Sequence, residues 1–439
     1  MKENDELNKL KSKKIEKLED KIKAFFKESK AKYESKKKTI LLIIKKQPGE
    51  IDWILPILYK LKNDFNIIAV FEKNLVLKQL KENKILYKLF SEVAFSFVEN
   101  LFFKSIFLRL AKKISLIFKI KRLTNFIQNK IYESYYDIFK LEQDIKKKYP
   151  HFNIKSLKFL MQDLADNSAW TNKFYENDKS LNIIYYPHTT NICSSLINFN
   201  INKINFKINS FLLINSFYDV IYFKNRFIET NKFISGYPKY DKSWLNKLDK
   251  FYKKKIQTNR KIFITYKGFQ EGKYSKIMYI EQVKALFDFV EKKKNISLVF
   301  KFHPNAQEEK VFMSVANKFS KHLWKIEKDH LHILYKNSDV SVAFYKNASI
   351  LESLACGKAP IQLWNISNNK NIKSVYSKLK LCFVVKDSLS LDKKLNFLLD
   401  NTKPKTQKLI LKRFKKICGN INSIERVYRL ILKISKLKS

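Results

Sequence analysis

Residues 338–363 read SDVSVAFYKNASILESLACGKAPIQL. The apolar run that ends at Phe344 is typical of a strand buried on both faces of a parallel sheet. A helix is expected from Ser349 to Cys356, because its apolar positions recur with helical spacing and Gly357 ends it. A second strand follows at residues 359–363. Strand, helix and strand in succession form the repeating unit of an open α/β sheet.

The same alternation extends outward from this stretch. Upstream, RKIFITY (260–266) and ISLVFKF (296–302) are strand patterns on either side of a long helix. The first half of the chain repeats the pattern with the apolar runs TILLII (39–44), NIIAVF (66–71) and LNIIYY (181–186). We therefore predict an α/β protein with two doubly wound, Rossmann-like domains that face a cleft.

The boundaries of this architecture follow from the same patterns. A charged helix is expected over residues 1–38, a first α/β domain with a basic segment as an insertion over residues 39–233, and a second α/β domain over residues 234–439. The pattern over residues 123–180 is largely helical, and HLHIL (330–334) has the alternation of a short strand.

The chain is strongly basic. Its 439 residues include 88 Lys and Arg against 41 Asp and Glu, which gives a formal net charge of +47. Such a surface attracts phosphate-bearing partners, namely nucleic acid, anionic lipid or nucleotide-linked substrates. The chain is also rich in Lys, Asn, Ile and Phe with only 6 Gly and 8 Pro, as AT-rich codons would produce, so the charge alone does not choose among these partners.

The membrane signals are limited to one segment. No run of 18 apolar residues is present, so no transmembrane helix is expected. Residues 101–122 carry seven basic residues among Leu, Ile and Phe, which suits either a core helix with a basic outer face or a helix lying on an anionic membrane. The four scattered cysteines fit a reducing cytosol. We expect a cytoplasmic protein that is peripheral to the inner face of the cytoplasmic membrane.

Two groups of residues in the second half could carry chemistry. His303 and Pro304 follow a strand, and ligands of open α/β sheets bind at the carboxyl ends of strands. Ser349 and Glu352 have two interpretations. They could form an S-x-x-E capping box, or Glu352 could accept hydrogen bonds from ribose hydroxyls. Neither a GxGxxG dinucleotide fingerprint nor a P-loop is present.

These segments carry a family resemblance. KFHPN (301–305), followed by residues 338–363, resembles the nucleotide-sugar-binding half of GT-B glycosyltransferases, particularly bacterial enzymes of surface-polysaccharide (capsule and lipooligosaccharide) biosynthesis with an HP motif. Capsule Kdo transferases, polysialyltransferases, some sialyltransferases and teichoic-acid glycerophosphotransferases share this pattern. SGYPKYD (235–241) is similar to the segment that leads into their second domain.

The resemblance implies roles on the donor side. His303 and Pro304 would contact the donor phosphates, Ala348 and Ser349 would present backbone N–H groups to them, and Glu352 would hold the ribose. Lys267 and Gly268 would line the first loop of the second domain. We expect no cofactor and no metal besides the nucleotide-sugar co-substrate, because metal-ligand clusters are absent from the sequence and Lys and His can balance phosphate charge.

The acceptor side needs a base to deprotonate a hydroxyl group. The candidates are His188, at the end of a predicted strand, and Glu50 and Asp52, in the first loop beside Gly49. Asp163 and Asp166 are interpreted as carboxylates on a helix surface.

The primary hypothesis is a metal-independent glycosyltransferase that moves a sugar from a nucleotide-sugar donor to a surface-glycan or lipid-linked acceptor. The alternative within the same fold is a nucleotide-sugar epimerase or hydrolase. A nucleic-acid-binding protein is the least favoured reading, because the basic residues spread along the whole chain and no nucleic-acid motif appears.

Overall fold

The computed structural model describes residues 32–98, 137–164, 169–188, 210–216, 219, 231–252, 259–266, 275–293, 295–303, 309–345, 347–364, 374–400, 405–418 and 422–436. The basic segment 101–122 lies outside these ranges. So does the charged helix expected over residues 1–38, except that residues 32–37 form a turn before the first strand. No helix among the described residues is long and apolar enough to cross a bilayer.

The first domain is built on a parallel sheet of seven strands in the order β3-β2-β1-β4-β5-β6-β7. The strands are β1 (Lys38–Ile44), β2 (Phe65–Phe71), β3 (Phe95–Val98), β4 (Leu157–Asp163), β5 (Asn182–Tyr186), β6 (Ser210–Ile214) and β7 (Asn231–Ile234). In β1, Leu41 lies opposite Ile68 of β2 on one side and Leu160 of β4 on the other.

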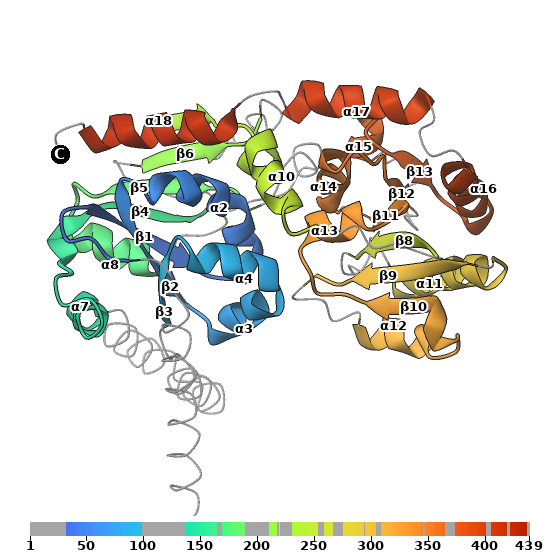
Figure 1. Ribbon diagram of the computed structural model, residues 1–439, viewed down its shortest axis with the longest axis horizontal. Coiled ribbons are helices and arrows are strands. Elements are labelled where there is room, and N and C mark those ends of the chain that lie inside the picture. The colour runs from blue at the N-terminus through green and yellow to red at the C-terminus, as the bar shows by residue number, and fades with distance from the viewer. Residues whose placement is uncertain are drawn as a thin grey trace, which may run out of the picture.

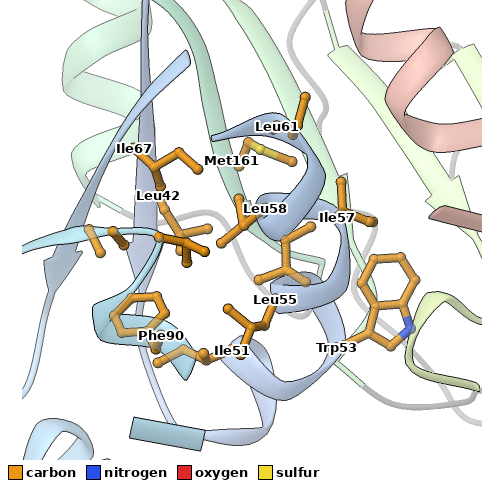
Figure 2. Close-up of a cluster of buried hydrophobic side chains, with 14 of the residues drawn as sticks. Leu42, Ile51, Trp53, Leu55, Ile57, Leu58, Leu61, Ile67, Phe90 and Met161 are labelled. Carbon is orange, nitrogen blue, oxygen red and sulfur yellow. The ribbon is translucent and has the colours of Figure 1, made fainter. Parts of the chain in front are cut away.

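Helices cover both faces of this sheet, so its inner strands carry buried apolar side chains on both faces. One face packs against α2 (Gly49–Leu61), α3 (Asn74–Glu82) and α4 (Lys84–Ser91). The other face packs against α7 (Ile138–Lys146) and α8 (Ala169–Asn177). Figure 2 shows the first of these layers, where Ile51, Leu55 and Leu58 point from α2 toward the sheet. Their helical spacing places them on one side of α2.

The second domain has a parallel six-stranded sheet in the order β10-β9-β8-β11-β12-β13. Its strands are β8 (Arg260–Thr265), β9 (Ile296–Lys301), β10 (Trp324–Ile326), β11 (Val340–Phe344), β12 (Ile361–Leu363) and β13 (Phe383–Val385). Its helices are α11 (Lys276–Glu291), α12 (Glu309–Ala316), α13 (Leu331–Lys336), α14 (Ser349–Ala355), α15 (Val375–Lys378), α16 (Ser388–Asp400) and α17 (Lys405–Cys418). The short 3-10 segments of the chain are Ile154–Ser156, Pro238–Tyr240 and Lys321–Leu323.

Two helices join the domains. The chain leaves β7, passes through the 3-10 turn Pro238–Tyr240 and enters α10 (Lys242–Asp249), while α18 (Ser423–Lys436) follows α17. Both α10 and α18 bury side chains in the core of the first domain. In Figure 1, α17 lies over the second domain and α18 over the first, along one edge of the molecule. The predicted division at residue 234 placed α18 in the second half of the chain, but in space it packs against α2.

The predicted α/β class with two doubly wound domains is confirmed. Two local predictions are wrong. Residues 157–163 were expected to be helical, yet they form β4 between β1 and β5. HLHIL was expected to alternate as a strand, yet it begins helix α13, with His330 as the N-cap residue. In both segments the local pattern is short, and packing against the neighbouring elements decides the structure.

Candidate functional site

A cavity of about 480 Å³ lies between the two domains. From the first domain it is lined by the β1–α2 loop, the start of α2, parts of α3 and α4, and His188 in the loop after β5. From the second domain it is lined by the ends of β9 and β10, the start of α13 and the start of α14. Its charged and polar lining includes Asp52, His188, Lys239, Lys301, His303, His330, Ser349 and Glu352.

The start of α14 forms part of the second-domain wall. Its N-cap residue is Ala348, which provides no side-chain cap, and the amide oxygen of Asn347 accepts from the backbone N–H of Ser349 at 3.0 Å. The Oγ atom of Ser349 lies 2.6 Å from Oγ1 of Thr265 on β8, so this hydroxyl is directed into the domain. The capping-box interpretation of Ser349 and Glu352 is therefore wrong. Glu352 is left to face the cavity, one helical turn into α14.

A network of alternating charges crosses the floor of the cavity. Oε1 of Glu352 accepts a hydrogen bond from Nζ of Lys239. The same Nζ lies 3.7 Å from Oδ2 of Asp52 on α2. The other oxygen of Asp52 lies 2.9 Å from Nε2 of His330. The network therefore links the first domain, the connecting turn and the second domain.

The charges in this network stabilise one another. Burial works to raise the pKa of Asp52, but the positive charges of His330 and Lys239 hold the pKa of this carboxyl well below its ordinary value. Burial lowers the pKa of Lys239, and the carboxylates of Glu352 and Asp52 more than offset that effect, so its pKa lies above the ordinary value. Asp52 is thus an anion held by Lys239 and His330, which makes it a poor acceptor for a substrate proton.

A second pair lies on the first-domain wall. Nδ1 of His188 lies 2.8 Å from Oδ1 of Asp163, and the backbone N–H of His188 donates to the same oxygen at 3.1 Å. Asp163 ends β4 and is 1% exposed, whereas His188 follows β5 and lines the cavity. Because Nδ1 is held by Asp163, Nε2 is the ring nitrogen left for a substrate.

Nearby charges set the protonation of His188. Burial lowers the pKa of His188, but the carboxylates of Asp163 and Glu50 raise it and leave it above the ordinary value, with Lys46 opposing them. A histidine oriented by a buried carboxylate is the arrangement of a general base.

Glu50 does not line the cavity. It is fully buried, and its carboxylate accepts hydrogen bonds from the backbone N–H groups of Lys45 (2.9 Å), Lys46 (2.7 Å) and Gln47 (3.2 Å). Burial, followed by the charge of Asp163, raises the pKa of Glu50. The prediction of Glu50 as a candidate base is therefore wrong. Its carboxylate instead stabilises the conformation of the β1–α2 loop.

Cationic groups lie at the end of β9. Nζ of Lys301 donates to the carbonyl oxygens of Lys328 (2.8 Å) and Asp329 (2.6 Å) and so fixes the turn that precedes His330. Burial lowers the pKa of Lys301 to about 8, against the charges of Asp329 and Asp52. His303 lies two residues further on, exposed at the cavity wall. These groups can balance the charge of a bound phosphate.

The sequence-predicted residues separate into three groups. The structure brings His188, Asp52, His303, Ala348, Ser349 and Glu352 to one cavity. Glu50 lies beneath it, and Lys267, Gly268 and Pro304 lie outside the described residues. Lys239, Lys301 and His330 were not among the sequence-predicted site residues, and Asp163 was interpreted as a surface carboxylate. The signal for Asp163 was its position two residues after the apolar run FLM (159–161), at the end of a strand.

The described residues contain no group of three or more His, Cys, Asp or Glu side chains placed to hold a metal ion. A metal-independent reaction remains a proposal.

Comparisons with known proteins place this architecture among solved structures. No family model matches the chain, and no curated protein matches it. A crystal structure of S. aureus MnaA with UDP is similar with 12% identity and a TM-score of 0.54, over 90% of this chain and 97% of that chain. A UDP-N-acetylglucosamine 2-epimerase is similar with 12% identity and a TM-score of 0.55, over 92% of this chain and 98% of that chain. At these identities the likeness establishes the fold alone, a two-domain GT-B-like architecture.

Proposed function

We propose that this protein is a nucleotide-sugar enzyme, and specifically a metal-independent glycosyltransferase that acts on a hydroxyl of a surface-glycan or lipid-linked acceptor. The observation that carries the proposal is the His188–Asp163 pair on one wall of the cavity, facing a second-domain wall that bears Glu352, Lys301 and His303. One wall thus offers a base, and the other offers carboxylate and cationic partners for a nucleoside diphosphate.

The proposed reaction uses these groups as follows. Nε2 of His188 accepts the proton of the acceptor hydroxyl as its oxygen bonds to the anomeric carbon of the sugar. The bond from that carbon to the donor phosphate breaks, and the nucleoside diphosphate leaves with the bonding electrons. Lys301 and His303 balance the charge that develops on the leaving phosphate. Asp163 keeps the imidazole in the productive tautomer and stabilises its protonated form.

The donor proposed first is a UDP-sugar, which the UDP in the MnaA structure supports.

The acceptor proposal includes a location at the inner face of the cytoplasmic membrane, and it rests on the basic and apolar composition of residues 101–122. Neutralising the lysines of that segment should release the protein from anionic vesicles, and unchanged binding would contradict this part of the proposal.

A nucleotide-sugar epimerase or hydrolase is the second candidate, and the name of the similar 2-epimerase favours it. In an epimerase the base on the first-domain wall would remove a proton from a sugar carbon, and in a hydrolase it would remove a proton from water, whereas a transferase removes it from an acceptor hydroxyl. The two reactions differ in what happens to the donor when no acceptor is present.

The test is to incubate the protein with UDP-N-acetylglucosamine in D2O, without and with an extract of bacterial glycolipids, and to analyse the products by mass spectrometry. A transferase leaves the donor free of carbon-bound deuterium and releases UDP in proportion to the acceptor modified. Deuterium on the sugar carbon of recovered donor would establish the epimerase instead. His188→Ala should lower turnover by about a hundredfold or more, the usual contribution of a general base.

A further inference from the structure

We infer that Lys239 is a positioning residue that holds the Glu352 carboxylate for the ribose hydroxyls of the nucleotide and ties that carboxylate to the first domain. This inference rests on the proposed function, because it assigns a role to a residue that supports the same site. Lys239 lines the cavity beside Glu352, and its ion pairs are with Asp52 and Glu352. The role assigned to it is the placement of the Glu352 carboxylate.

The backbone fixes the place of Lys239. It lies in the turn Pro238–Tyr240, one of the two connections between the domains. Gly236 precedes this turn with a φ of 82°, which favours glycine. The N–H of Ser235 donates to the carbonyl of Ile214 at 2.7 Å, and Tyr237 stacks on Tyr240 with 5.6 Å between ring centroids. The lysine therefore extends from an anchored turn rather than from a loose loop.

The two oxygens of Glu352 have different environments. Oε1 accepts from Lys239, whereas Oε2 is buried and has no hydrogen-bond partner among the described residues. A buried carboxylate oxygen without a partner costs free energy, and such an atom in a native structure calls for a ligand or water that supplies the missing donor. Glu352 lines the cavity, so the adjacent hydroxyls of a ribose are donors of the right chemistry at the right place.

The network also shows why Glu352 depends on Lys239. Asp52 has a second partner, His330, at 2.9 Å. Glu352 forms its ion pair with Lys239, and the described residues provide no other cation within ion-pair distance of it. The side chains of Lys239 and Glu352 are 13% and 14% exposed, so water screens the pair little. Removing the ammonium therefore leaves Asp52 partnered and leaves Glu352 as an uncompensated buried charge.

The experiment measures the affinities of UDP and 2′-deoxy-UDP by titration calorimetry for the native chain, Lys239→Met, Lys239→Arg and Lys242→Met. Lys242 is an exposed lysine three residues further on, so Lys242→Met is the matched control. The native chain and Lys242→Met should bind UDP about tenfold or more tightly than 2′-deoxy-UDP, since a lost hydrogen bond to a charged group has this size. Lys239→Met should weaken UDP binding about tenfold and bring the two affinities within about twofold of each other. Lys239→Arg, which keeps the charge, should recover part of the difference.

The outcomes separate this inference from the function on which it rests. If Lys239→Met keeps the native preference for UDP, the role of Lys239 is wrong while nucleotide binding stands. If the native chain binds neither nucleotide, both proposals are wrong. Should Lys239→Met fail to fold, the double variant K239M/E352Q removes both charges together and leaves no unpaired ion. Like the single variant E352Q, the double variant should bind UDP and 2′-deoxy-UDP with similar affinities. A native preference for UDP in either variant would overturn the inference.

Discussion

His188 is the residue on which the proposed chemistry depends most. As a base it works only when its imidazole is neutral, so activity falls as the pH drops through its pKa. Asp163 and Glu50 raise this pKa above the ordinary value despite burial, and Lys46 opposes them. Asp163→Asn should therefore move the acid limb of the pH profile of kcat/KM to lower pH and also reduce the maximal rate, because the ring is less well oriented.

The measurement for this prediction is the pH dependence of kcat/KM for the native chain and Asp163→Asn. Glu142→Gln on α7, outside the cavity lining, is the control that should leave the profile in place. An acid limb that stays put, or that moves to higher pH, would contradict the pairing of His188 with Asp163.

For Glu50 we predict an effect on the stability of the fold rather than on the rate of the reaction. Both of its oxygens accept backbone N–H groups of the β1–α2 loop. Glu50→Gln turns one of these oxygens into an NH2 group that faces a donor, so the free energy of unfolding should fall by about 1–3 kcal/mol. Urea denaturation measures it, with the exposed Glu281→Gln of α11 as the control. Equal stability of the two variants would show that the loop does not depend on this carboxylate.

For individual residues, a place at the site could be predicted from the sequence where it follows from the residue's position in a local pattern. His188, His303 and Glu352 stand at strand ends or early in a helix, so their place at the cleft could be expected. Asp163, Lys239 and His330 act through partners distant in the chain. His330 and Asp52 are 278 positions apart in the sequence, so no local spacing predicts that they are in contact.

Helix α13 shows how one element joins the two domains. His330 contacts Asp52, and Nε2 of His332 lies 2.6 Å from Oδ1 of Asp249 on α10. Nδ1 of His332 lies 3.2 Å from Sγ of Cys356, so the order of groups resembles a Cys-His-Asp catalytic triad. Burial, however, raises the pKa of Cys356 to about 12, which keeps the thiol protonated near neutral pH. The cluster is therefore a contact between elements and not a nucleophile.

This interpretation of Cys356 predicts slow alkylation. Iodoacetamide at neutral pH should label Cys356 much more slowly in the folded protein than in urea, as followed by mass spectrometry of the peptide that contains it. Labelling of the folded protein as fast as the unfolded one would mean that Cys356 carries an accessible thiolate.

Elements with long apolar runs were predictable, and short ones were not. The strands at 39–44, 66–71 and 181–186 were recognised because each is a continuous apolar run. The run of β4 is interrupted by Lys158 and flanked by helical patterns, so only its place between β1 and β5 reveals it as a strand. The edge strands β10 and β13 have three residues each. Segments this short show no hydrophobic pattern from which a strand could be predicted.

At the scale of the whole molecule, α18 returns the end of the chain to the first domain. Val427 and Ile431 are fully buried against α2 and its neighbours. Ile431→Ala should lower the free energy of unfolding by about 2–5 kcal/mol through lost burial and the cavity left behind. Denaturation of this variant beside Lys433→Ala, on the exposed face of the same helix, measures the effect. A loss below about 1 kcal/mol would mean that α18 is only loosely attached.

The central claim is that the cavity between the domains binds a nucleotide through Glu352. The most direct measurement is thermal unfolding of the native chain and Glu352→Ala at physiological salt, with UDP, GDP, CDP, CMP or a single-stranded oligonucleotide. We predict that UDP at about 100 times its dissociation constant raises the free energy of unfolding of the native chain by about 2.7 kcal/mol. The same concentration should raise that of Glu352→Ala far less. Stabilisation by the oligonucleotide alone, or by UDP equally in both proteins, would contradict it.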